Sequence, residues 1–85
     1  MPKKQEIPTE LLNQSAAVLL AARLTAGVSQ REVSKRINVT QPLISSWEKG
    51  KTIPTINHIV AIEQALQLQA GSLLMAIAYG NQKES

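Results

Sequence analysis

The sequence predicts an all-α protein whose five short helices pack into one compact domain. Apolar residues make up 44% of the 85 residues and charged residues 18%, which is the composition of a globular domain rather than of a disordered chain. Apolar side chains recur at helical spacing, and no stretch shows the sustained alternation of a half-buried strand. We expect the domain over residues 9–80, between a flexible polar arm at 1–8 and a frayed tail at 81–85.

The first helix is expected over residues 10–26. Its N-cap is expected at Thr9, with Glu10 in the first turn, where a carboxylate offsets the positive end of the helix dipole. Gly27 is expected to end the helix, because glycine readily takes the left-handed conformation found at helix C-termini.

The second helix is expected over residues 30–37. Ser29 and Glu32 have the spacing of a capping box, in which each side chain bonds to the backbone N–H of the other residue. Asn38 is expected to end the helix in the left-handed conformation, which asparagine tolerates better than most residues.

The third helix is expected over residues 41–49, directly after a short turn. Thr40 is its expected N-cap, and Pro42 lies in the first turn, where its missing N–H costs nothing. Ile44 and Trp47, three residues apart, are expected to point into the core. Two short helices joined by so short a turn form a helix-turn-helix, whose second helix can enter the major groove of DNA.

The last two helices are expected over residues 55–67 and 72–79. Thr55 is expected to cap the first of them, and a short break separates the two. Both helices are rich in apolar residues, and Glu63 is the only charged residue between positions 52 and 82.

The positive charge of the chain is concentrated on the predicted helix-turn-helix. The whole chain has nine Lys and Arg residues against six acidic ones, a formal net charge of +3. The segment 30–51 alone has five basic and two acidic residues, again +3. A cationic surface beside a groove-reading helix is what binding to DNA phosphates requires. A solvated helix face is the alternative interpretation of these charges.

The composition argues against several classes of function. The chain has no cysteine and no aspartate, and its single histidine, His58, has no second ligand for a metal nearby in the sequence. Because no nucleophile with a base and no phosphate-binding glycine loop is present, we expect no enzyme, no cofactor, no metal site and no small-molecule ligand. The longest apolar runs have seven residues, whereas a membrane span needs about 20. Without a secretory signal, a cytoplasmic, nucleoid-associated protein is expected.

The segment 28–54, VSQREVSKRINVTQPLISSWEKGKTIP, closely resembles the Cro/lambda-repressor-like (XRE-type) DNA-binding domain. The most specific matches, all at the spacing of the family, are Ser29, Gln30, Ile44, Trp47, Glu48, Gly50 and Pro54. The resemblance extends over residues 10–79. It implies a five-helix lambda-repressor-like fold and a DNA-binding transcriptional regulator.

The resemblance also implies which side chains meet DNA. Gln41, at the start of the third helix, matches a position that reads base edges, and glutamine is suited to adenine. Leu43 and Ser46 are expected on the same exposed face and in contact with bases; for Leu43 a place in the core is the alternative. The expected phosphate contacts are Gln30, Arg31, Thr40, Lys49, Lys51 and Thr52. Arg23 and Glu48 match an ion pair that ties the first helix to the third.

Three positions depart from the family pattern. Asn38 replaces the usual glycine of the turn, and Ser34 replaces the usual alanine, which is similarly small. Pro42 occupies a position that is often a polar base reader, so apolar contact and DNA shape are expected to carry more of the specificity. For Lys3 and Lys4, contact with DNA and a solvated tail both stay open.

An excess of apolar residues near the C-terminus indicates a homodimer interface. The residues expected in this interface are Leu73, Leu74, Ile77 and Tyr79. A fully internal five-helix core is the alternative interpretation. The resemblance implies a dimer on a palindromic operator in double-stranded DNA, with half-sites about one helical turn apart.

A repressor that occludes a promoter is the function these observations favour. From the length of the sequence, we expect no separate ligand-binding or catalytic domain. The alternative is an antitoxin or other protein-interaction module whose DNA binding is secondary. The short arm and tail argue against it, because such proteins usually carry an additional partner-binding segment. A phage, plasmid, restriction-modification or toxin–antitoxin setting is left open.

Overall fold

The computed structural model describes residues 7–80 of the chain, which form five α-helices and, within that range, no strand. In chain order the helices are α1 (Thr9–Ala26), α2 (Gln30–Ile37), α3 (Gln41–Glu48), α4 (Ile56–Ala65) and α5 (Ser72–Tyr79). The predicted all-α fold is confirmed. Most of the predicted arm, including Lys3 and Lys4, and the predicted tail lie outside the described residues.

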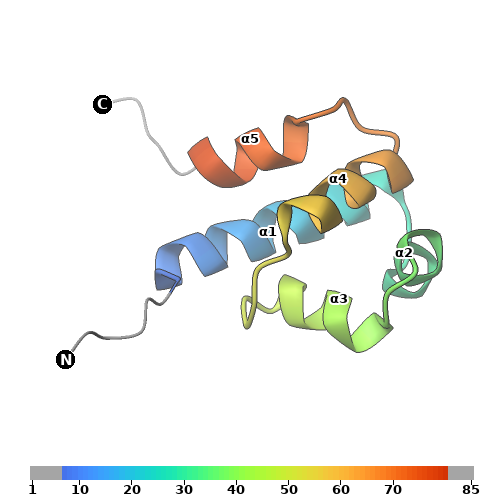
Figure 1. Ribbon diagram of the computed structural model, residues 1–85, viewed down its shortest axis with the longest axis horizontal. Coiled ribbons are helices and arrows are strands. Elements are labelled where there is room, and N and C mark those ends of the chain that lie inside the picture. The colour runs from blue at the N-terminus through green and yellow to red at the C-terminus, as the bar shows by residue number, and fades with distance from the viewer. Residues whose placement is uncertain (1–6, 81–85) are drawn as a thin grey trace.

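The long helix α1 runs through the middle of the molecule, with α3 along one side and α5 along the other (Figure 1). The helix α2 packs against α3 and α4, and α4 also packs against α5. The helix-turn-helix formed by α2 and α3 therefore lies on the side of α1 away from α5. Within residues 7–80, no single helix is long and apolar enough to cross a membrane, and the α1–α2 pair that passes this test together is bent by 97°.

All five helices contribute side chains to one hydrophobic core. Its buried members are Leu19, Val33, Ile44, Trp47, Ile59, Ile62, Leu66, Leu73 and Ile77. Trp47 is only 3% exposed, as predicted, and its ring lies 5.0 Å from that of His58 between centroids. Each large apolar side chain buried in this way contributes roughly 1.5–3 kcal/mol, so the core is the main source of stability.

The helix α5 divides its apolar residues between the core and the surface. Leu73 and Ile77 are 3% and 4% exposed and belong to the core, so the prediction that they lie in an interface with a second chain is corrected. Leu74, Met75 and Tyr79 are 38%, 57% and 55% exposed. Since residues three and four apart share a helix face, Leu73 and Ile77 turn inward together and leave a narrower outer face.

The helix N-termini follow the predictions in part. The hydroxyl of Ser29 accepts the N–H of Glu32 at 3.0 Å, as a capping box requires. The reciprocal bond is absent from the described residues, because the Glu32 carboxylate instead accepts from Arg36 Nε at 3.0 Å. The prediction for Thr9 is wrong, since Thr9 is the first residue of α1 and Pro8 is its N-cap. Thr40 is the N-cap residue of α3, but its hydroxyl makes no capping hydrogen bond.

The C-termini of α1, α2 and α4 involve residues with positive φ. Gly27 and Asn38 end α1 and α2 with φ of 73° and 59°, as predicted. The predicted end of α4 at residue 67 is wrong by two residues, because Gln67 has φ 59° and already lies in the turn. The N–H of Leu68 then bonds back to the Glu63 carbonyl at 2.8 Å, which closes the helix with a Schellman-type turn.

The carboxylate of Glu63 joins α4 to α5. It is buried, with 3% exposure, and accepts the N–H groups of Gly71 at 2.9 Å, Leu73 at 2.8 Å and Leu74 at 3.4 Å. These N–H groups belong to the start of α5, which has no capping side chain of its own. A negative charge there also offsets the positive end of the α5 dipole. Glu63 thus acts as the cap of α5 from a neighbouring helix.

A buried hydroxyl in α1 leads to a prediction about stability. Ser15 is 0% exposed, and its Oγ has no hydrogen-bond partner among the described residues. We expect Ser15→Ala to raise the free energy of unfolding by about 1 kcal/mol, because it removes an unsatisfied polar group and improves helix propensity. Thermal unfolding should show a Tm higher by about 4–8 °C. The reverse change at the exposed Ala17 of the same helix is the control, and a lower Tm for Ser15→Ala would contradict the prediction.

Candidate nucleic-acid interface

The turn between α2 and α3 is held by hydrogen bonds within the helix-turn-helix. Asn38 takes the left-handed conformation, and the next N–H, that of Val39, bonds to the Ser34 carbonyl at 3.1 Å. Ser34 is buried under this turn, and its hydroxyl donates to the Arg31 carbonyl at 2.7 Å. The departures from the family pattern at Asn38 and Ser34 therefore fit the turn without an unsatisfied polar group.

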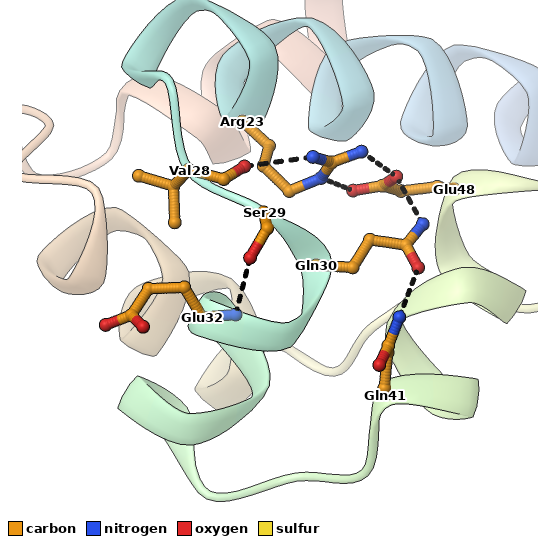
Figure 2. Close-up of polar contacts among 7 residues, drawn as sticks. All are labelled: Arg23, Val28, Ser29, Gln30, Glu32, Gln41 and Glu48. Carbon is orange, nitrogen blue, oxygen red and sulfur yellow. Dashed lines mark hydrogen bonds and ion pairs between the residues drawn. The ribbon is translucent and has the colours of Figure 1, made fainter.

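An ion pair ties α1 to the end of α3. Arg23 donates from Nε to Glu48 Oε2 at 2.7 Å and from Nη2 to Glu48 Oε1 at 2.9 Å, and this bidentate pair confirms the prediction (Figure 2). The Arg23 Nη1 also donates to the Val28 carbonyl at 2.9 Å, just before α2. Both charged side chains are mostly buried, at 13% and 7% exposure. The pair thus fixes α1, the start of α2 and the end of α3 relative to one another.

The same ion pair extends through two glutamines to the start of α3. Gln30 donates from Nε2 to Glu48 Oε1 at 2.9 Å, and its Oε1 accepts from Gln41 Nε2 at 3.4 Å (Figure 2). Both glutamines were predicted to meet DNA, and the structure brings their side chains together. The contact orients the exposed Gln41 side chain while leaving its carbonyl oxygen and one N–H for a further partner.

The ion pair changes the pKa of both partners. The hydrogen bond to Glu48 raises the pKa of Arg23 further above its ordinary value. Burial alone raises the pKa of Glu48, but the hydrogen bonds from Arg23 and Gln30 and the charge of Arg23 outweigh burial and lower it overall. The carboxylate is therefore ionised at neutral pH and stabilises the fold in that form.

This shift predicts a pH dependence of stability. Because the Glu48 pKa is lowered on folding, its contribution is present above the ordinary value of 4.5 and is lost as the pH falls through the lower, folded value. Glu48→Gln is expected to reduce the free energy of unfolding by about 1–3 kcal/mol at pH 7, since Arg23 keeps its charge without a charged partner. Urea unfolding at pH 7, 5, 4 and 3 should show this difference shrinking below pH 4.5. The exposed Glu10→Gln is the control, and a difference independent of pH would contradict the assignment.

The exposed face of α3 differs from the predicted one at one position. Gln41 is exposed, and Ser46 is half-buried. Leu43 is half-buried and packs against the core, so its predicted place on this face is corrected. The physical reason is that Leu43 lies four residues before the buried Trp47 and shares its side of the helix. Helical spacing also places Pro42 and Ser45 beside Gln41. Pro42 matches a family position that is often a base reader, whereas Ser45 was not predicted on this face.

The loop after α3 is attached to the exposed face. The hydroxyls of Ser46 and Thr52 are hydrogen-bonded to each other at 3.0 Å. Lys49, Lys51 and Thr52 are all exposed. The predicted base-contacting Ser46 therefore lies next to the predicted phosphate-contacting loop.

The exposed charge of this region is almost entirely positive. Between positions 23 and 51 there are six basic and two acidic residues, and both acidic side chains are in ion pairs, Glu48 with Arg23 and Glu32 with Arg36. The remaining basic side chains, all exposed, are Arg31, Lys35, Lys49 and Lys51. Arg36 also donates to the Ala65 carbonyl at 2.8 Å, which directs it toward α4. The surface formed by the N-terminal turns of α2 and α3 and by residues 49–52, here called the α2–α3 surface, suits a polyanion.

Comparison with known proteins supports the helix-turn-helix fold. A model of the helix-turn-helix family matches residues 19–73 of the chain. The restriction-modification controller protein C.Esp1396I has a similar structure, with a TM-score of 0.73 at 21% identity over 88% of this chain and 96% of that one. A point mutant of that protein gives the same TM-score and identity over 88% and 95% of the two chains.

A second solved structure is also similar. The clp gene regulator ClgR from C. glutamicum has a TM-score of 0.74 at 20% identity, over 94% of this chain and 100% of that one. At these identities the likeness concerns the fold. No curated protein sequence matches the chain significantly.

Proposed function

Because the chain belongs to the XRE-type helix-turn-helix family of DNA-binding transcriptional regulators, we propose that it is a sequence-specific repressor. In this proposal it binds a palindromic operator as a homodimer, with residues 41–49 in the major groove. The observation that carries the proposal is the hydrogen-bonded chain from Arg23 through Glu48 and Gln30 to Gln41. Held in this way, Gln41 loses little side-chain freedom when it meets a base.

The proposed contacts divide into base readout and phosphate binding. Gln41 reads a base edge, with adenine as the base that its amide matches best, and Ser46 makes a second contact. Phosphates are bound by the exposed Arg31, Thr40, Lys49, Lys51 and Thr52 and by the free N–H of the Gln30 side chain. The N-terminal turns of α2 and α3 add backbone N–H groups that favour an anion.

The proposed dimer interface is the outer face of α5. Support comes from Leu74, Met75 and Tyr79, whose exposed apolar surface lies on the side of α1 away from α3. Two helix-turn-helix units related by a two-fold axis would then meet two half-sites about one helical turn, roughly 34 Å, apart.

Charged substitution on α5 tests the dimer. Leu74→Glu is expected to raise the dimer dissociation constant about tenfold or more, because the dimer would bury a charge on each chain. Sedimentation at a series of protein concentrations measures this shift. Leu24→Glu makes the same change on the exposed side of α1, where Leu24 is 61% exposed, and should leave the constant unchanged. If both variants have the same dimer dissociation constant as the parent chain, the outer face of α5 is not the dimer interface.

Selection of bound DNA tests the function itself. Genomic fragments are selected at near-physiological salt, and the best duplex and a shuffled duplex are then titrated at two salt concentrations. We expect an inverted repeat that binds two chains and is preferred over the shuffled duplex by about a thousandfold or more. Binding that is equal for both duplexes and abolished by salt would contradict sequence-specific recognition.

A further inference from the structure

Pro42 forms part of a shallow hollow on the exposed face of α3. The hollow is lined by Gln30, Gln41, Pro42 and Ser45, so it lies between the start of α2 and the first turn of α3. Pro42 is exposed and follows Gln41 directly in the chain. The hollow therefore adjoins the side chain that is proposed to read a base.

The lining of the hollow carries no charge, and the Pro42 ring is its apolar side chain. None of the four lining side chains is charged, so the hollow lacks the cation that a phosphate contact favours. Proline has no backbone N–H and offers only its ring. The Gln30 amide is hydrogen-bonded to Glu48 and Gln41, and its remaining N–H is assigned to a phosphate in the proposed complex. Among the groups that base pairs present in the major groove, the C5-methyl group of thymine is the apolar one.

We propose that the Pro42 ring is a specificity-determining contact for the C5-methyl group of a thymine next to the base read by Gln41. This inference rests on the proposed function, because it places α3 in the major groove. The ring is rigid and has almost no conformational freedom to lose on contact. Because the ring itself carries no donor or acceptor, it responds only to the presence of the methyl group.

Replacing thymine by deoxyuridine removes only this methyl group and leaves base pairing intact. In the selected operator, each thymine of a half-site is replaced in turn, symmetrically in both half-sites. At one thymine position, replacement by deoxyuridine should lower the affinity of the parent protein for the operator by about fourfold for each half-site. This is the loss expected for one buried methyl group. If the selection yields no specific duplex, the proposed function fails. If it yields a specific duplex whose affinity does not depend on any thymine methyl group, only the Pro42 contact fails.

Variants of the protein assign this effect to Pro42. Pro42→Gly removes the ring, and Pro42→Ser replaces it with a polar side chain that favours helix starts; with either variant the thymine and deoxyuridine duplexes should bind equally. Gln69→Ala, at an exposed position between α4 and α5 and outside the proposed DNA interface, is the control and should keep the full difference between the two duplexes. If removal of the methyl group lowers the affinity of the parent protein and of both Pro42 variants equally, the proposal is overturned. Pro42 would then serve only to start α3.

The same methyl group also occurs on 5-methylcytosine. Cytosine and 5-methylcytosine are therefore placed at the identified position, again in both half-sites. We expect the parent protein to bind the methylated duplex more tightly than the unmethylated one, and the thymine duplex most tightly of all. No difference between cytosine and 5-methylcytosine would show that the methyl group is not what is read, and a preference for 5-methylcytosine over thymine would overturn the assignment to thymine.

Discussion

Glu63→Gln is expected to lower the free energy of unfolding by about 2–4 kcal/mol, because three backbone N–H groups at the start of α5 lose their charged acceptor. An amide of the same size keeps one acceptor oxygen but turns an NH2 group toward N–H donors. For a domain of this size that loss is a large fraction of the total stability. Thermal unfolding should show a Tm lower by at least about 10 °C.

The matched control is the same substitution at an exposed carboxylate. Glu32 pairs with Arg36 across one helical turn, with 45% and 41% of the two side chains exposed. Glu32→Gln should therefore cost less than about 1 kcal/mol. If the two variants unfold at the same temperature, Glu63 does not hold α5 as the structure indicates. If Glu63→Gln also weakens dimerisation, α5 is the element that links fold and assembly.

Gln41→Ala and Lys51→Ala are expected to weaken DNA binding in different ways. Removing Gln41 should lower affinity for the operator by roughly 10- to 100-fold and leave affinity for a shuffled duplex nearly unchanged, since it deletes a base contact. Removing Lys51 should lower affinity for both duplexes and reduce the salt dependence of binding by about one phosphate contact per chain. Titrations of both duplexes at several salt concentrations measure the two effects.

This pair of variants separates base readout from electrostatic attraction. Gln69→Ala, at an exposed glutamine between α4 and α5, is the control for removal of a glutamine side chain. It should bind both duplexes like the parent chain. If Gln41→Ala is neutral on the operator while Lys51→Ala abolishes binding, the positive charge of the α2–α3 surface accounts for binding and α3 does not read the sequence.

Local signals in the sequence were sufficient to predict most of the fold. Gly27 and Asn38 ended the first two helices as predicted, because the left-handed conformation favours these residue types. Trp47 was assigned to the core from its spacing to Ile44. The Arg23–Glu48 ion pair followed from the family resemblance rather than from the pattern of this chain alone.

The predictions that were corrected concern which side of a helix is buried. The helix α5 has eight residues and almost no polar ones, so its periodicity does not reveal that Leu73 and Ile77 are the inward pair. Only the packing of α5 against α1 and α4 decides it. Leu43 was misplaced for a simpler reason, since its spacing of four residues from Trp47 already indicated the buried side.

Glu63 was missed because an isolated charge usually lies in solvent. The spacing of its neighbours did indicate burial, because Ile59, Ile62 and Leu66 lie near Glu63 on α4 and all three are buried. A glutamate within such a stripe needs a partner inside the fold. That partner is the start of a different helix, and nothing in the sequence near Glu63 identifies it.

We propose that DNA lies across the α2–α3 surface. The amide chemical shifts of isotope-labelled protein, recorded as the selected duplex is added, show which residues meet the DNA. The largest changes in chemical shift are expected in the first turns of α2 and α3 and in residues 49–52. The second half of α4 lies outside this surface, and its shifts should change less. Changes centred on α4, with α3 unaffected, would contradict the claim and place the DNA on another face of the protein.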